Sequence, residues 1–223
     1  MKNISKRFTI AIIHRNGFRR LKAALDSAIN IAGKSDEILI IDNASTDNSM
    51  EKIEQDNAYK NIKIIKNSCN TGYAYTCNQA MSQGNGKYFL LCNNDIKLPK
   101  NCLSDFEKIF IDFPESGIIG GQLLDVNQNM VGSYSKAPTF FSELDSIGRL
   151  RSPERYQTIH EVGTLRGACL AVRRSTVESA GMMDEDFFFY FEETEWCTRI
   201  AKNGWKVLIA PHIKITHIGG DST

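Results

Sequence analysis

Short apolar runs alternate with longer amphipathic segments along the first part of the chain. The apolar runs are rich in β-branched residues and end in turn-forming residues, so they predict strands over residues 8–13, 37–41, 62–65 and 88–92. From Leu21, apolar residues recur at i, i+3, i+4, i+7 and i+8, which predicts a helix ending near Gly33. Shorter helices are predicted over residues 50–55 and from 70–72 to about 82. This alternation predicts βαβ units and a mostly parallel sheet.

The second part of the chain continues the pattern less regularly. It predicts helices over residues 99–110, 175–180 and 192–203, and sheet over residues 117–124 and 163–172. A hairpin turn is expected at residues 125–129, an irregular polar segment at 133–161, and a last strand flanked by His212 and His217. The whole pattern predicts an α/β domain with a mostly parallel central sheet, flanking helices and a small antiparallel element in its second half.

Length, charge and cysteine usage restrict the class of protein. The 223 residues fit one domain, and the net charge of +1 provides no polyanion-binding field, which disfavours nucleic-acid binding. The six cysteines lack the CxxC spacing of zinc knuckles and favour a reducing cytoplasm over a disulfide framework. No signal peptide precedes the first strand, and no apolar stretch approaches the roughly 20 residues that span a bilayer, so membrane contact is expected only at a surface.

Polar, turn-forming residues follow each of the first four predicted strands. They are Asn16, residues 42–47, residues 70–72 and residues 93–95. Because the carboxyl ends of parallel strands meet at one edge of a sheet, these residues predict a nucleotide-binding crevice at that edge. No GxGxxG follows the first strand and no GxxxxGK[ST] occurs, which argues against a dinucleotide-binding fold and a P-loop ATPase.

Asp95 is the best candidate for a metal ligand. It follows a buried strand together with Asn93 and Asn94, and a carboxylate among amide oxygens suits Mg²⁺ or Mn²⁺ carrying a phosphate ligand. An ordinary Asn/Asp turn after a strand is the alternative interpretation. His217 precedes a Gly-Gly pair at a strand end and is a candidate third contact to metal or phosphate, although a single histidine is more often structural.

A second acidic cluster, Glu192-Glu193-x-Glu195, opens the last predicted helix. Helical spacing places Glu193 on the apolar face with Trp196 and Ile200, and places Glu192 and Glu195 toward the other side. The helix macrodipole explains acidic residues in a first turn but not a carboxylate on the apolar face. Glu193 is therefore expected to be half-buried with a raised pKa, as a general base requires, although the helix N-terminus opposes that rise.

Taken together, the motifs resemble the inverting family-2 glycosyltransferases of the A-type nucleotide-sugar (GT-A) fold. The likeness is closest to the bacterial rhamnosyltransferase-like members that build cell-surface polysaccharides, and it covers nearly the whole chain. The matching positions are Asn16-Gly17, Asp42-Asn43, Ser45, Asp47, Asn70, Gly72, Asn78, Asn93-Asn94-Asp95, Gly167-Ala168, Glu192-Glu193-x-Glu195 and His217. No single motif is specific, but their combination in this order is.

The resemblance implies one GT-A-type domain over residues 1–223, with a nucleotide-sugar-binding half at about 1–98 and an acceptor and catalytic half at about 99–223. It implies that Asp42 and its neighbours hold the base and ribose of a UDP- or dTDP-sugar. Asp95 would be the principal ligand of Mn²⁺ or Mg²⁺, assisted by His217, and Glu193 would deprotonate the acceptor hydroxyl. The implied donor-binding residues are Asn16, Asp42, Asn43, Ser45, Asp47, Asn70, Gly72, Asn78, Asn93 and Asn94, and the implied acceptor-side residues are Gly167, Ala168 and Glu192.

The implied activity is metal-dependent hexosyl transfer, with inversion, to a glycan or lipid-linked glycan. It implies a cytoplasmic protein in cell-surface polysaccharide biosynthesis, compatible with peripheral contact with the inner face of the cell membrane. Three departures bear on this activity: His14-Arg15 replaces the usual Thr-Tyr, Asn93 replaces the first Asp of the metal motif, and Glu193 replaces the more common Asp. Many relatives continue well beyond the His-x-Gly-Gly stretch, so the chain is also compatible with one piece of a longer protein.

Two other functions stay open at this level. A sugar-phosphate nucleotidyltransferase also needs a parallel sheet and a metal carboxylate, but it normally has a glycine-rich basic loop that only Arg15, Gly17, Arg19 and Arg20 could imitate. A catalytically weak nucleotide-sugar-binding module would follow if Asn93 and the short C-terminus had disabled turnover. Binding of a nucleoside diphosphate without sugar transfer would indicate that second alternative.

Overall fold

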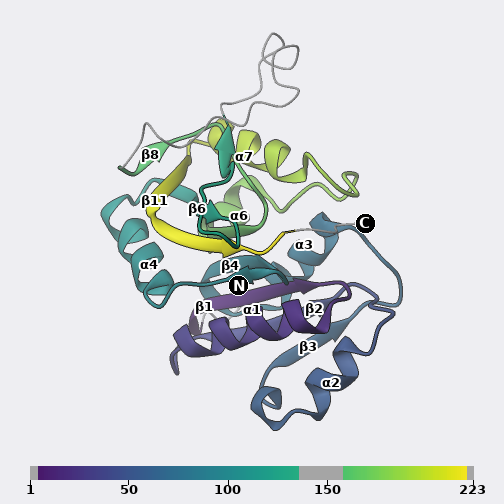
Figure 1. Ribbon diagram of the computed structural model, residues 1–223. Coiled ribbons are helices and arrows are strands. Elements are labelled where there is room, and N and C mark those ends of the chain that lie inside the picture. The colour runs from purple at the N-terminus through teal and green to yellow at the C-terminus, as the bar shows by residue number, and fades with distance from the viewer. Residues whose placement is uncertain (1–4, 136–157, 220–223) are drawn as a thin grey trace.

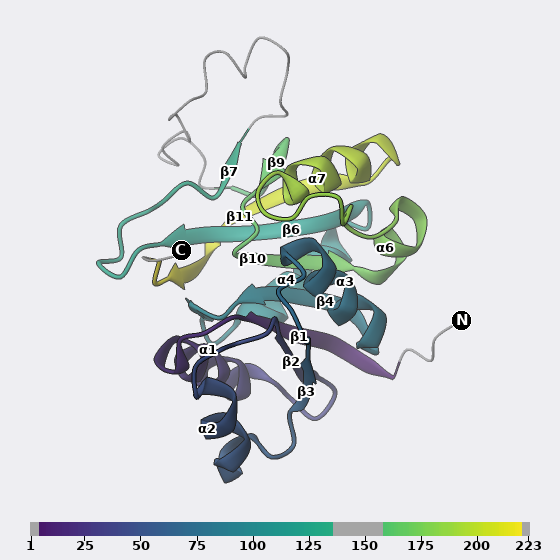
Figure 2. The same ribbon diagram turned by 90° about the vertical axis from the view of Figure 1, so that its right-hand side faces the viewer.

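A central β-sheet organises the chain, as the computed structural model shows for residues 5–135 and 158–219 (Figure 1). Within these residues the sheet contains nine strands, in the order β3-β2-β1-β4-β10-β6-β11-β5, with β8 beside β11. Figure 2 shows the strands following one another from β3 to β11. Their bounds are β1 (Lys6–His14), β2 (Glu37–Asp42), β3 (Lys63–Lys66), β4 (Gly86–Asn93), β5 (Ile96–Lys97), β6 (Ser116–Leu124), β8 (His160–Glu161), β10 (Cys169–Arg173) and β11 (Lys206–His217).

The strand directions confirm the mostly parallel sheet. β1 pairs in parallel with β2 and β4, β2 pairs in parallel with β3, and β6 pairs in parallel with β11. β10 lies antiparallel between β4 and β6. Because β10 runs the opposite way, its amino end lies at the edge where β1, β2 and β4 have their carboxyl ends. Residues just before β10 therefore reach the edge at which ligands bind in such sheets.

Helices cover both faces of the sheet. α1 (Phe18–Ile31), α2 (Ser49–Gln55) and α4 (Cys102–Asp112) contribute to one apolar core, and α3 (Tyr73–Gln83), α6 (Arg174–Ala180) and α7 (Glu192–Lys202) contribute to the other. Side chains of β1 alternate between the two, with Ile10 and Ile12 in the first core and Ala11 and Ile13 in the second. A 3₁₀ turn (Asn57–Tyr59) follows α2. None of the described helices combines the length and apolar character needed to cross a bilayer.

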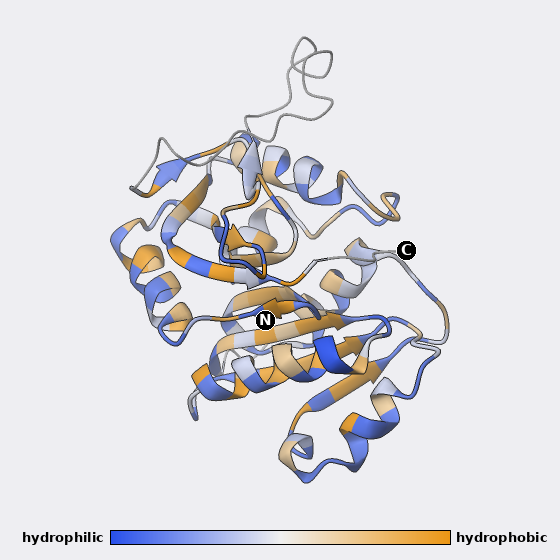
Figure 3. Cartoon of the chain, in the orientation of Figure 1, coloured by the Kyte–Doolittle hydropathy of each residue, from blue (hydrophilic) through white to orange (hydrophobic). Residues whose placement is uncertain are grey.

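Burial on both faces explains why the strands are apolar along most of their length. Every residue of β6 is buried, as is nearly all of β4. Figure 3 shows the strands coloured mainly as hydrophobic, whereas the helices carry both colours because only one side of each contacts the sheet. This pattern is expected when a parallel sheet is covered by helices on both sides.

Several boundaries differ from the sequence predictions. The helix expected from Pro99 begins at Cys102, where the backbone N–H bonds to the carbonyl of Pro99. The sheet expected over 163–172 divides into β9 (Thr164–Leu165), which pairs with β7 (Tyr134–Ser135), and β10. The sequence pattern did not predict β5. Of the predicted irregular segment, residues 136–157 lie outside the described residues.

The prediction that two histidines flank the last strand is wrong for one of them. β11 continues from Lys206 to His217, so His212 lies inside the strand, where it is exposed. The pairing of β11 with β6 shifts register between Ala210 and Lys214, and this irregularity accommodates Pro211 and His212 without ending the strand. Only His217 reaches the ligand-binding edge.

Candidate active site

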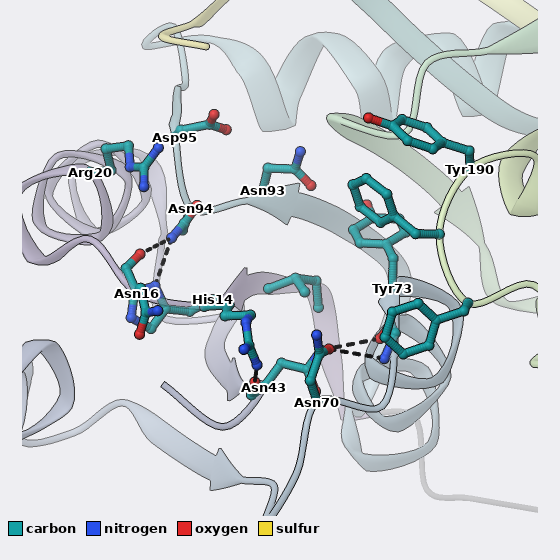
Figure 4. Close-up of a pocket in the computed structure, with 15 residues that line it drawn as sticks. His14, Asn16, Arg20, Asn43, Asn70, Tyr73, Asn93, Asn94, Asp95 and Tyr190 are labelled. Carbon is teal, nitrogen blue, oxygen red and sulfur yellow. Dashed lines mark hydrogen bonds between the residues drawn. The ribbon is translucent and has the colours of Figure 1, made fainter. Parts of the chain in front are cut away.

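A cavity of about 470 Å³ opens at the carboxyl edge of β1, β2 and β4 (Figure 4). This is the edge at which the sequence predicted a nucleotide crevice. The lining residues are Ile13, His14, Arg15, Asn16, Arg20, Asn43, Asn70, Gly72, Tyr73, Asn93, Asn94, Asp95, Phe188, Phe189 and Tyr190. The volume lies in the range of small-molecule sites, and the mixture of apolar walls with convergent amides is typical of them.

The loops after β1 and β2 are joined by side-chain hydrogen bonds. Asn16, at a positive φ of 55°, accepts from the backbone N–H of Thr46 at 2.8 Å, and its own N–H donates to Ser45 Oγ at 2.9 Å. Asp47 Oδ2 accepts from the backbone N–H of Gly17 at 2.7 Å. Burial alone would raise the pKa of Asp47, but hydrogen bonds from Ser49 and Gly17 outweigh it and lower that pKa. The two loops thus form one fixed wall of the cavity.

An amide network fixes the opposite wall. Asn43 Nδ2 donates to Asn70 Oδ1 at 2.7 Å, and Asn43 Oδ1 accepts from both the N–H and the hydroxyl of Thr71 at 2.9 Å. Asn70 Oδ1 also accepts from the N–H of Gly72 at 3.2 Å. These bonds order the turn before α3, and the predicted residues Asn43, Asn70 and Gly72 therefore share one surface of the cavity.

His14 connects the end of β1 to the motif after β4. Asn94 Nδ2 donates to the backbone carbonyl of Asn16 at 2.9 Å and to His14 Nδ1 at 2.8 Å, so His14 Nδ1 is the acceptor. His14 Nε2 then donates to Ser49 Oγ at 2.8 Å, and that hydroxyl donates to Asp47. Burial lowers the pKa of His14 to about 4, although Asp42 and Asp47 oppose the change. His14 is therefore neutral near pH 7 and fixes the orientation of the Asn94 amide.

The two predicted metal ligands lie together at the end of β4. His217 Nε2 is 3.3 Å from Asp95 Oδ1, and this carboxylate oxygen is buried without a hydrogen-bond partner among the described residues. β5 and β11 create the contact, since Ile96 pairs with His217 and the N–H of Ile218 donates to the carbonyl of Asp95 at 2.8 Å. One carboxylate and one imidazole fit a divalent cation whose remaining ligands are phosphate and water. The described residues contain no third His, Cys, Asp or Glu in this group.

An aromatic loop before α7 covers one side of the cavity. Phe188, Phe189 and Tyr190 line it, yet each is at least half exposed, at 57%, 50% and 64%. The carbonyl of Phe188 accepts from the N–H of Tyr73 at 3.2 Å. Gly72 has a φ of +84°, and a Cβ there would lie 2.5 Å from that carbonyl oxygen. Glycine is therefore required where α3 begins against the aromatic loop.

Glu193 lies next to the cavity on the same side as the aromatic loop. A Cβ added to Gly167 would be 3.4 Å from Tyr73 Cε1 and 3.7 Å from Glu193 Oε1, so both side chains converge on Gly167. The Tyr73 hydroxyl donates to the carbonyl of Gly167, and the carbonyl of Ala168 accepts from the N–H of Asn93 at 2.9 Å. Glu193 Oε2 is buried and has no hydrogen-bond partner among the described residues. The predicted base and the residues predicted at the acceptor side are thus neighbours.

Glu192 is buried, contrary to its predicted place on the solvent side of the helix. It is 4% exposed and lies one turn before Trp196, which is fully buried, so both belong to the stripe of α7 that faces the core. Burial raises the pKa of Glu192 to about 7, and the neighbouring Glu193 charge adds to the rise. The prediction for Glu192 is wrong because Glu192 stands four residues before Trp196, and this spacing places the two side chains on one face of the helix.

Some predicted donor residues lie outside the cavity. Asn78 Nδ2 donates to the carbonyl of Met183 at 2.9 Å and to Glu185 at 2.8 Å, and Asn78 Oδ1 accepts from the N–H of Met183. Its amide thus holds the turn that precedes the aromatic loop. Asp42 is 4% exposed and accepts from the N–H and hydroxyl of Ser45. Asp42, Ser45 and Asp47 therefore shape the loops around the cavity without lining it.

From the sequence, neither Tyr73 nor the aromatic loop is assigned to the cavity, and Arg20 is named only for the alternative nucleotidyltransferase function. Arg20 belongs to an ordinary amphipathic helix, and Tyr73 follows directly after a recognised motif, so neither has a pattern of its own. The run of aromatics at 187–191 was a usable signal, because consecutive exposed aromatics are unusual outside binding surfaces.

Comparison with known proteins decides the family. Residues 9–181 match the family model described as Glycosyl transferase family 2. The chain belongs to this family. It is also 23% identical over 209 residues to the N-acetylglucosaminyl-diphospho-decaprenol L-rhamnosyltransferase of Mycobacterium tuberculosis, which covers 83% of this chain and 67% of the relative. The predicted likeness to rhamnosyltransferase-like family-2 enzymes is confirmed.

Solved structures confirm the fold. The S. aureus protein TarS (residues 1–349) in complex with UDP-GlcNAc superposes with a TM-score of 0.72 at 16% identity, covering 97% of this chain and 60% of that one. The mannosyltransferase PcManGT from Pyrobaculum calidifontis, in complex with GDP-Man and Mn²⁺, gives a TM-score of 0.71 at 18% identity, covering 100% of this chain and 60% of that one. This family-2 glycosyltransferase thus has a GT-A fold and spans about three fifths of those two chains.

Proposed function

We propose that the chain transfers a sugar from a nucleoside-diphosphate sugar to a lipid-linked glycan acceptor in cell-surface glycan biosynthesis. The mycobacterial relative is named for a diphospho-decaprenol acceptor, which supports the acceptor class. The complexes of TarS with UDP-GlcNAc and of PcManGT with GDP-Man support a nucleotide-sugar donor, and UDP or dTDP is the type expected here. Such an acceptor is compatible with peripheral contact with the inner face of the cell membrane.

The position of Glu193 beside the cavity carries this proposal. Its Oε2 atom is buried and unpartnered among the described residues, while its other oxygen faces Gly167 and Tyr73. A desolvated carboxylate with a free lone pair is suited to accept a proton from a hydroxyl group. Gly167 has no side chain, so nothing from this residue lies between its backbone and the Glu193 carboxylate.

The donor is assigned to the cavity enclosed by the ends of β1, β2 and β4. Asn16, Asn43 and Asn70 present amides that are already ordered by hydrogen bonds, so binding costs little additional side-chain entropy. Asn94 is held by neutral His14, and its remaining carbonyl oxygen is available to the donor. In this assignment Asp42, Ser45, Asp47 and Asn78 act by positioning loops.

Asp95 and His217 would hold a divalent cation, Mn²⁺ or Mg²⁺. The orphaned Asp95 Oδ1 atom and the nearby His217 Nε2 atom fit such an ion, and Mn²⁺ accompanies the donor in the PcManGT complex. When bound, the cation neutralises charge on the diphosphate. Asn93 contributes no charge, so the described protein ligands offer one carboxylate.

The proposed reaction is a single displacement. The acceptor oxygen attacks the anomeric carbon while its proton passes to Glu193. The bond between the anomeric carbon and the phosphate oxygen breaks through an oxocarbenium-like transition state, and the nucleoside diphosphate leaves with the electron pair. One displacement from the face opposite the leaving group inverts the anomeric configuration.

A thermal-shift panel tests the donor assignment. UDP, dTDP and GDP and their sugars are added with Mn²⁺, Mg²⁺ or a chelator. A ligand at 100 times its Kd adds about 2.7 kcal/mol to the free energy of unfolding, which is readily measured. Stabilisation by one nucleotide class supports the donor site, and stabilisation by none contradicts it. Binding without release of nucleoside diphosphate in the presence of acceptor would instead indicate a silent binding module.

A further inference from the structure

The cavity lining carries more positive than negative charge. Its fixed charges are the guanidinium groups of Arg15 and Arg20 and the carboxylate of Asp95. His14 also lines the cavity but is neutral near pH 7, since burial lowers its pKa to about 4. An excess of guanidinium groups in a concave site favours an anionic ligand.

The two arginines are placed differently. Arg15 Nη1 donates to the carbonyls of Asn43 at 3.1 Å and Ala44 at 3.5 Å, so its guanidinium lies along the loop after β2. Arg20 projects from the first turn of α1 back over Gly17, because a Cβ at Gly17 would lie 2.8 Å from Arg20 Nε and 2.9 Å from Nη2. Figure 4 shows its guanidinium beside Asn94 and Asp95. Arg20 is thus the arginine beside Asp95, one of the two candidate metal ligands.

Gly17 is what allows this placement of Arg20. It has a φ of +95° at the start of α1, and any side chain there would displace the guanidinium. The Gly17 N–H is held by Asp47, which fixes the turn. The positive charge of Arg20 contributes to the lowered pKa of His14, as expected for a cation close to the end of β1.

We propose that Arg20 binds the diphosphate of the donor and shares with the Asp95–His217 site the neutralisation of the leaving group. The inference rests on the proposed function and adds a residue to its donor site. A guanidinium presents a planar fork of donors that matches phosphate oxygens. Asn93 removes one carboxylate from the metal motif, so the Arg20 guanidinium neutralises a larger share of the charge on the leaving diphosphate. Part of the diphosphate affinity is therefore independent of metal.

The test compares Arg20→Gln, Arg20→Lys and Arg19→Gln. Arg19 is exposed on the same turn of α1 and does not line the cavity, so Arg19→Gln is a control for the lost charge. Calorimetric titration measures the affinity for inorganic pyrophosphate, for the nucleoside diphosphate that stabilises the wild type, and for its nucleoside. Each titration is made with Mn²⁺ and with chelator, and the melting temperature without ligand reports any change in folding.

Arg20→Gln is expected to weaken pyrophosphate and nucleoside diphosphate binding about tenfold or more, with the larger loss under chelator. Nucleoside binding should stay at the wild-type value, Arg20→Lys should retain part of the affinity for pyrophosphate and nucleoside diphosphate, and Arg19→Gln should retain all of it. Two results would overturn the role of Arg20 without affecting the proposed donor site. One is wild-type pyrophosphate affinity in Arg20→Gln, and the other is an equal loss of affinity for diphosphate and for nucleoside. A wild-type chain that binds no nucleoside diphosphate would overturn the donor site itself.

Discussion

His217 Nε2 lies 3.3 Å from Asp95 Oδ1, although Asp95 lies between β4 and β5 in the first half of the chain and His217 ends β11. The contact exists because β5, which directly follows Asp95, pairs with the end of β11. The last strand of the domain thus completes a site that begins after β4. Removing either residue should therefore weaken binding of the same divalent cation.

Asp95→Asn and His217→Ala are expected to abolish the part of nucleotide stabilisation that depends on metal. At 100 times Kd the wild type should gain about 2.7 kcal/mol with nucleotide and Mn²⁺, and each variant should fall to the value measured with chelator. Thermal shift checks this. His212→Ala is the control, because His212 is exposed within β11, away from the cavity. Full Mn²⁺-dependent stabilisation in Asp95→Asn would remove Asp95 from the metal site.

His14 should make the fold sensitive to mild acid. The folded chain resists protonation of His14 until its pKa of about 4, whereas the unfolded chain takes up this proton near pH 6.5. Between these values the unfolded state binds more protons, so stability falls as pH falls, by up to about 3 kcal/mol from this group. Denaturant unfolding between pH 7 and pH 4.5 measures the slope. His14→Gln should flatten it and His212→Gln should not; equal slopes in all three proteins would contradict the burial of a neutral His14.

Glu192 should have the opposite effect on the pH dependence of stability. Its folded pKa of about 7 lies above the ordinary 4.5, so the folded state binds more protons between these values and stability falls as pH rises through them. Glu192→Gln should raise the free energy of unfolding by about 2 kcal/mol at pH 8 and change it little at pH 4.5. Glu178→Gln, an exposed position on α6, should have little effect at either pH. A destabilised Glu192→Gln protein at pH 8 would show that the ionised carboxylate has a partner.

Gly72 and Gly204 together test the contact between α3 and the aromatic loop. Both have a φ of +84°, but an added Cβ would lie 2.5 Å from the Phe188 carbonyl at Gly72 and would meet nothing within 4 Å at Gly204. Gly204→Ala should cost about 1 kcal/mol, the price of the left-handed backbone alone. Gly72→Ala should cost about 1–3 kcal/mol more and should weaken donor binding, because Gly72 has a ψ of 172°, in a region that essentially only glycine adopts, and because the aromatic loop must shift. Equal losses would mean that the loop moves freely.

The fold and much of the cavity follow from the sequence pattern. Strand and helix periodicities predict the βαβ order, and the convergence of parallel strand ends then predicts Asn16, Asn43, Asn70 and Asp95 at one edge. These inferences needed only the chain direction of each strand. The direction in which each side chain points was not required.

The remaining features depend on tertiary packing. Glu192 stands four residues before Trp196, so helical spacing puts both on one face of α7, but how far that face is covered depends on tertiary packing. Asn78 has the expected position on α3, but its amide donates hydrogen bonds to Met183 and Glu185, which follow much later in the sequence. Arg20 reaches the cavity because Gly17 leaves space for its guanidinium. Sequence spacing locates such residues but not their partners.

The comparison of Glu193→Gln with Glu195→Gln tests the proposed mechanism most directly. Both residues lie in the first turn of α7, but Glu195 is paired with Arg199 at 2.7 Å, whereas Glu193 Oε2 is buried without a partner among the described residues. The measurement is the rate of nucleoside diphosphate release from the stabilising nucleotide sugar in the presence of a lipid-linked acceptor. We expect a loss of about 10²- to 10⁴-fold in the rate of Glu193→Gln with donor affinity unchanged, and a rate near wild type in Glu195→Gln. Transfer by Glu193→Gln at the wild-type rate would contradict the assignment of the base.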